Sequence, residues 1–258
     1  MARARPPRPQ LQVQDLLRSC RMCAADSLSR LRIAVTGATG GIGRALVAAL
    51  RERGAAVAAT GSDKRRLDSL TREVPGVFGR VADITDEEQV AGFVEAAVGE
   101  LGGLDVLVNL AGLSVPGEIA EASAADLGRM LDVNVSGTML ACKHAIPHLA
   151  GAQGLIVNVG SAAGLRPNAT APGYCTAKAA VAMFTAALSL QLKEQRIRVT
   201  HLAPGGTDTP FWGDRPVQRE SLMSPEDVVS ALLYIMSLPP HVVVRELLFE
   251  STGAPRSR

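Results

Sequence analysis

The chain has 258 residues, a length that can hold one large α/β domain or two small ones. Hydrophobic residues make up 47% of it and aromatic residues only 3%, so the core must consist mainly of Ala, Val, Leu and Ile, which suit parallel strands buried on both faces. The net charge of +2 gives no general case for nucleic-acid binding, and no apolar run approaches the roughly 18 residues of a membrane span. Four cysteines are too few for a disulfide framework, which favours a reducing compartment such as the cytoplasm.

Residues 1–30 form a basic arm, with six arginines against two aspartates. The arm is compatible with a weak organellar transit peptide, but a disordered extension, or a start placed too early with Met22 as the true first residue, is favoured. Cys20 and Cys23 form a C-x-x-C pair within it. A zinc site would need two further ligands and a thioredoxin-like motif its own strand and helix, so we assign this pair no function.

From residue 31 onward, short apolar runs alternate with longer amphipathic stretches. The runs predict strands over residues 31–36, 55–60, 77–82, 104–109, 154–159, 197–202 and 242–249. The amphipathic stretches predict helices over residues 42–53, 64–73, 86–99, 123–150 and 174–194, and a last helix beginning at Ser224. Residues 204–223 predict a loop with short helical turns. This alternation predicts an α/β fold with a doubly wound parallel sheet of about seven strands, a Rossmann fold. We expect one domain over residues 31–250, followed by a tail at residues 251–258.

A glycine-rich loop lies between the first predicted strand and the first predicted helix. It reads Thr36-Gly37-Ala38-Thr39-Gly40-Gly41-Ile42-Gly43. Gly37 permits a tight turn and a close approach of the backbone to a ligand, and Gly43 lets the helix pack against the strand. The free N–H groups at the start of that helix favour a phosphate. The loop therefore predicts a site for the pyrophosphate of a dinucleotide.

A second group of polar residues lies further along the chain. Tyr174 and Lys178 are spaced i,i+4 at the start of a helix and so share one face. A neighbouring ammonium favours the phenolate and is expected to bring the tyrosine pKa down toward the working pH. Ser161 lies thirteen residues before Tyr174, just past a predicted strand, and Asn134 lies twenty-seven residues before Ser161. The ends of parallel strands are where open α/β proteins place their sites.

The T-G-x-x-x-G-x-G loop, the Y-x-x-x-K segment and the spacings to Ser161 and Asn134 together resemble the short-chain dehydrogenase/reductase family. Further landmarks in family order are Asp83, Asn109-Leu110-Ala111-Gly112, Pro204-Gly205 and Thr209. The resemblance covers about residues 31–250. Two positions depart from it: Leu110 replaces the second Asn of the usual N-N-A-G, and Gly160 precedes Ser161 where the family usually has Ser-Ser.

The resemblance implies an NAD(P)(H)-dependent oxidoreductase that interconverts a carbonyl and a secondary alcohol on a small or medium substrate. Tyr174 would be the general acid or base, and Lys178 would lower its pKa and hold the ribose of the nicotinamide. Ser161 would donate a hydrogen bond to the substrate oxygen, and Asn134 would position a water that links Lys178 to solvent.

The same resemblance implies a cofactor site. Asp83 would meet the adenine and Thr209 the nicotinamide carboxamide. The expected cofactor-binding residues are Gly37, Thr39, Gly41, Ile42, Gly43, Gly61, Ser62, Asp83, Ile84, Asn109, Ala111, Gly112, Tyr174, Lys178, Pro204, Gly205, Thr207 and Thr209.

The residues after the second strand bear on the choice of cofactor. An acid there pairs with the 2′-hydroxyl of NAD and repels the 2′-phosphate of NADP. The position that would carry it is Gly61, followed by Ser62, and Asp63 is expected to point outward. Residues 64–66 are basic and begin a helix, where a phosphate could be held unless they form only a solvated face. NADP(H) is therefore favoured, with NAD(H) as the alternative.

Three mostly apolar segments, residues 113–118, 165–170 and 205–219, are expected to contact the substrate. The third includes Phe211 and Trp212, and Arg166 in the second is a possible anchor for a polar group. His144 and His148 lack a third ligand, so no metal is expected. We expect a homodimer or homotetramer and neither a nucleic-acid nor a membrane partner. The alternative function is a catalytically inactive Rossmann-fold protein that binds the cofactor as a sensor or interaction module.

Overall fold

The computed structural model describes residues 28–253, so residues 1–27 of the basic arm, with the Cys20–Cys23 pair and Met22, and residues 254–258 of the tail lie outside the described residues. Leu28, within the predicted arm, is 3% exposed and packs in a core cluster, so the domain begins slightly earlier than predicted. Its strands are β1 (Arg32–Thr36), β2 (Ala56–Ala59), β3 (Phe78–Gly79), β4 (Val106–Asn109), β5 (Leu155–Val159), β6 (Arg198–Pro204) and β7 (Glu246–Phe249). They form one parallel sheet in the order β3-β2-β1-β4-β5-β6-β7. This order reverses direction between β1 and β4, which is the switch point at which doubly wound sheets bind ligands.

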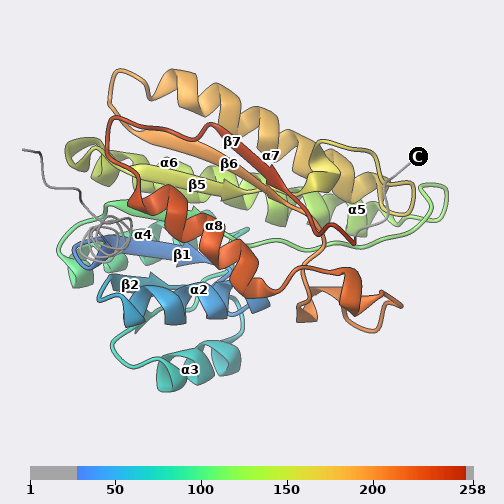
Figure 1. Cartoon of the computed structure of the whole chain (residues 1–258), viewed down its shortest axis with the longest axis horizontal. Coiled ribbons are helices and arrows are strands. Elements are labelled where there is room, and N and C mark those ends of the chain that lie inside the picture. Colours follow the sequence, from blue (N-terminus) through green and yellow to red (C-terminus); the bar gives the residue numbers. More distant parts are fainter. Residues whose placement is uncertain (1–27, 254–258) are drawn as a thin grey trace, which may run out of the picture.

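Helices cover both faces of the sheet (Figure 1). They are α2 (Gly41–Glu52), α3 (Lys64–Glu73), α4 (Glu87–Leu101), α5 (Ala124–Leu131), α6 (Gly137–Leu149), α7 (Pro172–Gln191) and α8 (Pro225–Ser237). The apolar sides of α2, α3 and α8 join one core cluster, and those of α4, α6 and α7 join the other. The predicted doubly wound Rossmann fold is confirmed.

The sheet separates the two core clusters because its strands alternate their side chains. In β1, Ile33 and Val35 belong to the cluster under α2 and α8, whereas Ala34 belongs to the cluster under α4 and α6. All three are 0% exposed, as expected for a parallel strand buried on both faces.

Two predicted strands, the third and the seventh, are shorter than expected by four residues each, and one predicted helix is divided. β3 has two residues because it is an edge strand whose single neighbour, β2, ends at Ala59. β7 begins at Glu246, after an irregular segment that includes the exposed Val242 and Val243. The helix expected over residues 123–150 is split by a π-helical turn over Asp132–Ser136. This turn contains Asn134.

Helix α7 is apolar over a longer stretch than expected, since no run near the length of a membrane span was predicted. The helix has 20 residues, and an 18-residue window within it has a mean hydropathy of 1.2, so by length and composition alone it could cross a membrane. The helix instead packs along β6, and Ala177, Val181 and Leu188 bury its inner side. A core helix of an α/β domain has this character, and the apolar run carries no argument for a membrane.

Candidate active site at the carboxyl ends of the strands

A cavity of about 1740 Å³ opens at the carboxyl ends of the strands. Ligand pockets usually measure about 300–1,000 Å³, so this cavity has room for a large cofactor and a substrate together. It is lined by the predicted residues Gly37, Thr39, Gly41, Ile42, Gly43, Gly61, Ser62, Asp83, Ile84, Ala111, Gly112, Ser161, Tyr174, Lys178, Pro204, Gly205, Thr207 and Thr209. Asn109 and Asn134 are the two predicted site residues that do not line it.

The glycine loop forms a cradle that side chains would fill. Gly37 has a φ of +63°, and a Cβ there would lie 2.5 Å from the backbone nitrogen of Ala111. A Cβ on Gly43 would lie 2.5 Å from the carbonyl oxygen of Gly37. No side chain caps the start of α2, and no acid lies in its first turn. The exposed N–H groups and the helix dipole therefore fit an anionic group such as a pyrophosphate.

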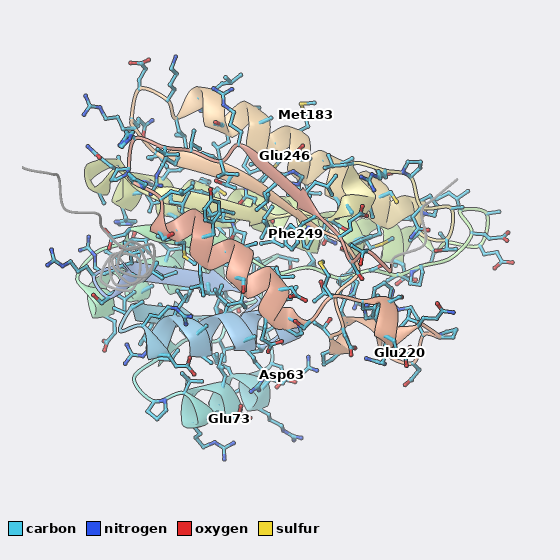
Figure 2. The ribbon with its side chains drawn as sticks, in the orientation of Figure 1. Asp63, Glu73, Met183, Glu220, Glu246 and Phe249 are labelled. Atoms are coloured by element: carbon cyan, nitrogen blue, oxygen red, sulfur yellow. The ribbon has the colours of Figure 1, made fainter. Side chains whose placement is uncertain are left out.

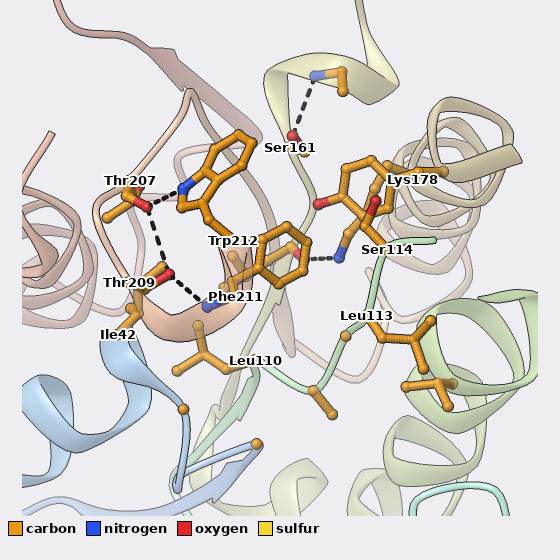
Figure 3. Close-up of a pocket in the computed structure, with 18 of the residues that line it drawn as sticks. Ile42, Leu110, Leu113, Ser114, Ser161, Lys178, Thr207, Thr209, Phe211 and Trp212 are labelled. Atoms are coloured by element: carbon orange, nitrogen blue, oxygen red, sulfur yellow. Dashed lines mark hydrogen bonds between the residues drawn. The ribbon is translucent and has the colours of Figure 1, made fainter. Parts of the chain in front are cut away.

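The loop after β6 reaches over to the glycine loop. A Cβ on Gly41 would lie 2.6 Å from Cγ2 of Thr209, so the two loops are in close contact. Trp212 Nε1 donates to the carbonyl oxygen of Thr207 at 2.8 Å, and Thr209 Oγ1 accepts from the backbone N–H of Phe211 at 3.4 Å. Figure 3 shows these side chains across the cavity from Ser161 and Lys178. The cavity is thus bordered by both loops and by α7.

Lys178 is a buried cation at the base of the cavity. It is 5% exposed, and its Nζ donates to the carbonyl oxygen of Val159 at 3.0 Å. Burial lowers its pKa to about 8, because the charged form loses hydration that one carbonyl replaces only in part. The lysine remains mostly protonated at neutral pH.

The pKa of Tyr174 is shifted upward, opposite to the expected direction. Burial raises the pKa of its hydroxyl to about 12, although a hydrogen bond with Ser161 and the charge of Arg215 act to lower it. Lys178 Nζ lies 5.8 Å from the centroid of the tyrosine ring. At that distance, with Nζ directed to a carbonyl, the ammonium does not overcome the burial of the phenol. The prediction that Lys178 brings this pKa down is therefore wrong for the protein without its ligands.

Asn134 lies in the π-helical turn, a type of helix irregularity that is frequent at functional sites. Its Nδ2 donates to the carbonyl oxygens of Leu113 and Met130, each at 2.8 Å, while its buried Oδ1 has no partner within residues 28–253. A Cβ on Gly112 would lie 2.8 Å from this Oδ1 and 3.3 Å from Lys178 Nζ. Both polar atoms therefore face the same point, which fits a bridging water.

Asn109 takes part in a buried network beneath the cavity. Its Nδ2 donates to Asn158 Oδ1 at 2.9 Å, and its Oδ1 accepts from Thr36 Oγ1 at 3.2 Å. Asn158 Nδ2 in turn donates to Thr185 Oγ1 at 3.1 Å. The side chain of Asn109 therefore ties β4 to β1 and β5, and the structure does not bring it to the expected cofactor site.

At the far end of the cavity, Thr39 crowds the place that the side chain of an acid at position 61 would take. A Cβ on Gly61 would lie 2.6 Å from Thr39 Oγ1. Asp63 points away and caps α3 by accepting from the backbone N–H of Arg66 at 3.1 Å, so the start of that helix already holds a carboxylate. Of the three basic residues at positions 64–66, Arg66 alone lines the cavity.

Charged residues border the other end of the cavity, where the substrate segments were expected. Arg166, the possible anchor for a polar group, lines the cavity and forms an ion pair with Glu250. Glu250, Arg129 and Arg215 also line the cavity and were not singled out from the sequence. Glu250 directly follows β7, so the preference for sites at the carboxyl ends of strands could have identified it.

His144 and His148 contact acids on the neighbouring helix. The Nε2 of His144 lies 3.2 Å from Glu87 Oε1, and that of His148 lies 3.0 Å from Glu95 Oε1. These pairs join α6 to α4 away from the cavity. Among the described residues, no group of three or more potential ligands forms a metal site.

Known proteins share both the sequence pattern and the fold. A family model described as short chain dehydrogenase matches residues 32–220. An uncharacterised oxidoreductase of Staphylococcus saprophyticus is 32% identical over 219 residues, which cover 83% of this chain and 94% of that protein. An uncharacterised oxidoreductase of Staphylococcus aureus is 33% identical over 217 residues, with the same coverage of the two chains.

Solved structures agree over the same region. The alcohol dehydrogenase of the archaeon Thermococcus sibiricus, complexed with 5-hydroxy-NADP, superposes with a TM-score of 0.82 and 28% identity, over 88% of this chain and 100% of its own. The serine dehydrogenase of Escherichia coli has a TM-score of 0.76 and 29% identity, over 84% of this chain and 96% of its own. The residues matched by the family model contain every strand from β1 to β6 and all of the predicted site residues.

Proposed function

The chain belongs to the short-chain dehydrogenase/reductase family of nicotinamide-dependent oxidoreductases, and we propose that it interconverts a carbonyl and a secondary alcohol with Tyr174 as the general acid or base. The observation that carries this proposal is the convergence of Tyr174, Ser161 and Lys178 on one cavity that also contains the glycine cradle.

A nicotinamide cofactor held at the glycine loop and near Thr209 would supply or accept the hydride, and the chain's own residues would move the proton. In reduction the Tyr174 hydroxyl donates its proton to the carbonyl oxygen, and in oxidation the phenolate accepts the proton of the alcohol. Ser161 Oγ donates a hydrogen bond to the same substrate oxygen and stabilises the negative charge that develops there. Burial raises the pKa of Tyr174 to about 12 in the protein without ligands, so the phenol carries at neutral pH the proton that reduction requires.

Lys178 and Asn134 would restore the proton to Tyr174. Lys178, whose pKa lies near 8, can lose a proton at moderate pH and regain it through a water held at Asn134 Oδ1. The unpartnered Oδ1 and the nearby Nζ support this role, because a water between them would satisfy both groups.

We assign NADP(H) as the favoured cofactor and NAD(H) as the alternative. Thr39 crowds the position of an acid that would select NAD, and Arg66 offers a positive charge to a 2′-phosphate. The structure of a serine dehydrogenase complexed with NADP⁺ is similar to this chain, with a TM-score of 0.80 and 26% identity. Measuring KM for both cofactors tests the assignment, and a marked preference for NAD(H) would overturn it.

The catalytic assignment is tested by the variant Tyr174→Phe. It should lose turnover on a panel of carbonyls and alcohols followed by nicotinamide absorbance, while cofactor binding persists. The chain's other tyrosine, Tyr234, is 56% exposed on α8, so Tyr234→Phe is a matched control that should keep its activity. A near wild-type rate in Tyr174→Phe would refute the role. Cofactor binding without turnover of any substrate by the wild-type protein would favour the inactive sensor instead.

We further propose a cytoplasmic homodimer or homotetramer with no nucleic-acid or membrane partner. Apolar side chains on the outer sides of the long central helices support self-association. Met183 and Leu190 on α7 are each 71% exposed, and Met139 on α6 is 40% exposed; Figure 2 shows Met183 on the side of α7 that faces away from the sheet. Light scattering of the purified protein tests this, and a monomer at micromolar concentration would exclude it.

A further inference from the structure

The end of the cavity near Tyr174 has an excess of positive charge. The whole lining contains five basic residues, Arg66, Arg129, Arg166, Lys178 and Arg215, and two acidic residues, Asp83 and Glu250. Arg66 and Asp83 follow β2 and β3, at the far end, and Arg166 is neutralised by Glu250. Arg129 and Arg215 therefore remain without a carboxylate partner among the described residues.

The Arg215 side chain is half-buried, and its guanidinium contacts two aromatic rings and two carbonyl groups. Its Cζ lies 5.2 Å from the ring centroid of Phe211 and 5.0 Å from that of Trp212, within the range of cation–π contacts. Its Nε donates to the carbonyl oxygen of Trp212 at 2.7 Å, and its Nη2 donates to that of Phe211. Two rings and two carbonyl groups thus fix the plane of the guanidinium.

This arrangement leaves part of the guanidinium available to a ligand. An arginine has five N–H donors, and two of them are used here, so three remain on Nη1 and Nη2. The edge of the guanidinium that carries Nη1 and Nη2, a fork of N–H donors, matches the two oxygens of a carboxylate. A fixed fork also loses little side-chain entropy when it binds.

The same arginine is connected to the proposed acid and base through one ring. The rings of Phe211 and Tyr174 are 5.8 Å apart between centroids, and Phe211 in turn packs under the guanidinium. The charge of Arg215 also acts to lower the pKa of the Tyr174 hydroxyl, against the larger effect of burial. A substrate that places its reacting carbon at Tyr174 therefore has Arg215 within reach of its neighbouring atoms.

We propose that Arg215 binds a carboxylate of the substrate, so that the protein acts preferentially on small hydroxy acids and oxo acids. This inference rests on the proposed oxidoreductase function and names the substrate class of the same site. Arg215 is then a specificity-determining residue in the loop after β6, and Phe211 and Trp212 orient it.

The first test compares each acid with its uncharged amide. The substrates are 2-hydroxybutyrate and 3-hydroxybutyrate, each beside the corresponding hydroxybutyramide, assayed by nicotinamide absorbance. Wild-type protein should prefer at least one acid to its amide. Arg215→Gln should lower kcat/KM for that acid roughly 10- to 100-fold, the usual effect of losing a charged hydrogen bond, and change the amide little. Arg215→Lys, which keeps the charge but loses the fork, should be intermediate.

Arg129→Gln is the matched control. Arg129 is exposed, lines the same cavity and makes no ion pair with the described part of the chain, so the variant removes the same charge from a guanidinium that is not fixed by rings and carbonyl groups. It should lower kcat/KM for the acid less than about threefold, as expected for a solvent-screened charge. An equal loss in the two variants would show a general electrostatic effect and overturn the role of Arg215.

The second test does not depend on turnover. Trp212 is the chain's single tryptophan and contacts Arg215, so its fluorescence reports on this site. Titration with butyrate, but not with butyramide, should give a saturable change in the wild type and in Arg129→Gln, and none in Arg215→Gln. An identical response to both probes, or weaker cofactor binding by Arg215→Gln, would overturn the proposal. A saturable butyrate response without turnover of any substrate would instead contradict the oxidoreductase function and leave the carboxylate site standing.

Discussion

Gly160 precedes the proposed catalytic Ser161 and leaves no room for a side chain. A Cβ built on it would lie 2.1 Å from Nε2 of His201 and 2.9 Å from Cδ2 of the same ring. The ring cannot move away easily, because His201 is 3% exposed in the sheet and its Nδ1 lies 3.0 Å from Glu246 Oε2. The variant Gly160→Ala therefore forces either the imidazole or the Ser161 turn to shift.

The size of the effect follows from the overlap. Overpacking a well-filled interior costs about 1–3 kcal/mol. For a domain of this size each kcal/mol lowers Tm by roughly 2–4 °C, so we expect a fall of about 2–12 °C in thermal unfolding followed by circular dichroism. Displacement of Ser161 by about 1 Å can reduce kcat by about 100-fold. Cofactor affinity should change less than kcat, because the glycine cradle is not involved.

A double-mutant cycle identifies the cause. His201→Ala removes the ring that causes the overlap, so Gly160→Ala combined with His201→Ala should be more stable than the sum of the two single effects predicts. Wild-type stability and activity in Gly160→Ala, or purely additive effects in the double variant, would refute the reasoning. The pair would also explain why this chain has Gly160 where its family usually has serine.

Two further outcomes concern stability. Replacing the buried Lys178 by Met should stabilise the cofactor-free protein at neutral pH. Since the native lysine has a pKa near 8 against an ordinary 10.5, the unfolded chain binds more protons between these values, and wild-type stability should rise across that window by about 3 kcal/mol relative to the variant. Urea unfolding at several pH values measures this, and a pH-independent difference would contradict it. Ser224→Ala removes the capping box that Ser224 forms with Asp227 at the start of α8, and should lower the free energy of unfolding by about 1 kcal/mol with activity unchanged. An unaltered Tm would argue against a stabilising cap.

The sequence predicted the fold well because its periodicity and its turn residues agree. The predicted bounds of the helix over Lys64–Glu73 and the predicted start of α8 at its cap, Ser224, agree with the structure to the residue. Each helix has a capping side chain next to an apolar pattern, and this combination marks a helix start clearly. The third strand was predicted too long, because a run of apolar residues does not reveal where the neighbouring strand ends. The π-helical turn was missed for a similar reason, as one inserted residue barely disturbs helical periodicity.

The sequence predicted which residues lie at the candidate site better than it predicted their charges and partners. Motif spacing identified residues that the structure brings to one cavity, since the carboxyl ends of parallel strands meet there. It could not give the direction of the Tyr174 pKa shift, which depends on burial, nor the ion pair that occupies Arg166. Nor could it show that the Asn109 side chain bonds within the sheet, because a polar residue at the end of a strand can turn either to the cavity or to its neighbouring strands.

The contact between Thr39 and position 61 constrains how this protein can change in evolution or in the laboratory. An aspartate at position 61 would be the simplest route to recognising NAD, yet its Cβ would overlap Thr39 Oγ1 unless that side chain rotates or is replaced by a smaller one. The effect of a mutation at position 61 therefore depends on the residue at position 39, so the order of the two mutations matters. A smaller residue at position 39 makes room for aspartate at position 61, whereas aspartate at position 61 alone overlaps Thr39. Under the proposed preference for NADP(H), libraries that randomise both positions together should yield NAD-dependent variants that libraries randomising one position at a time miss.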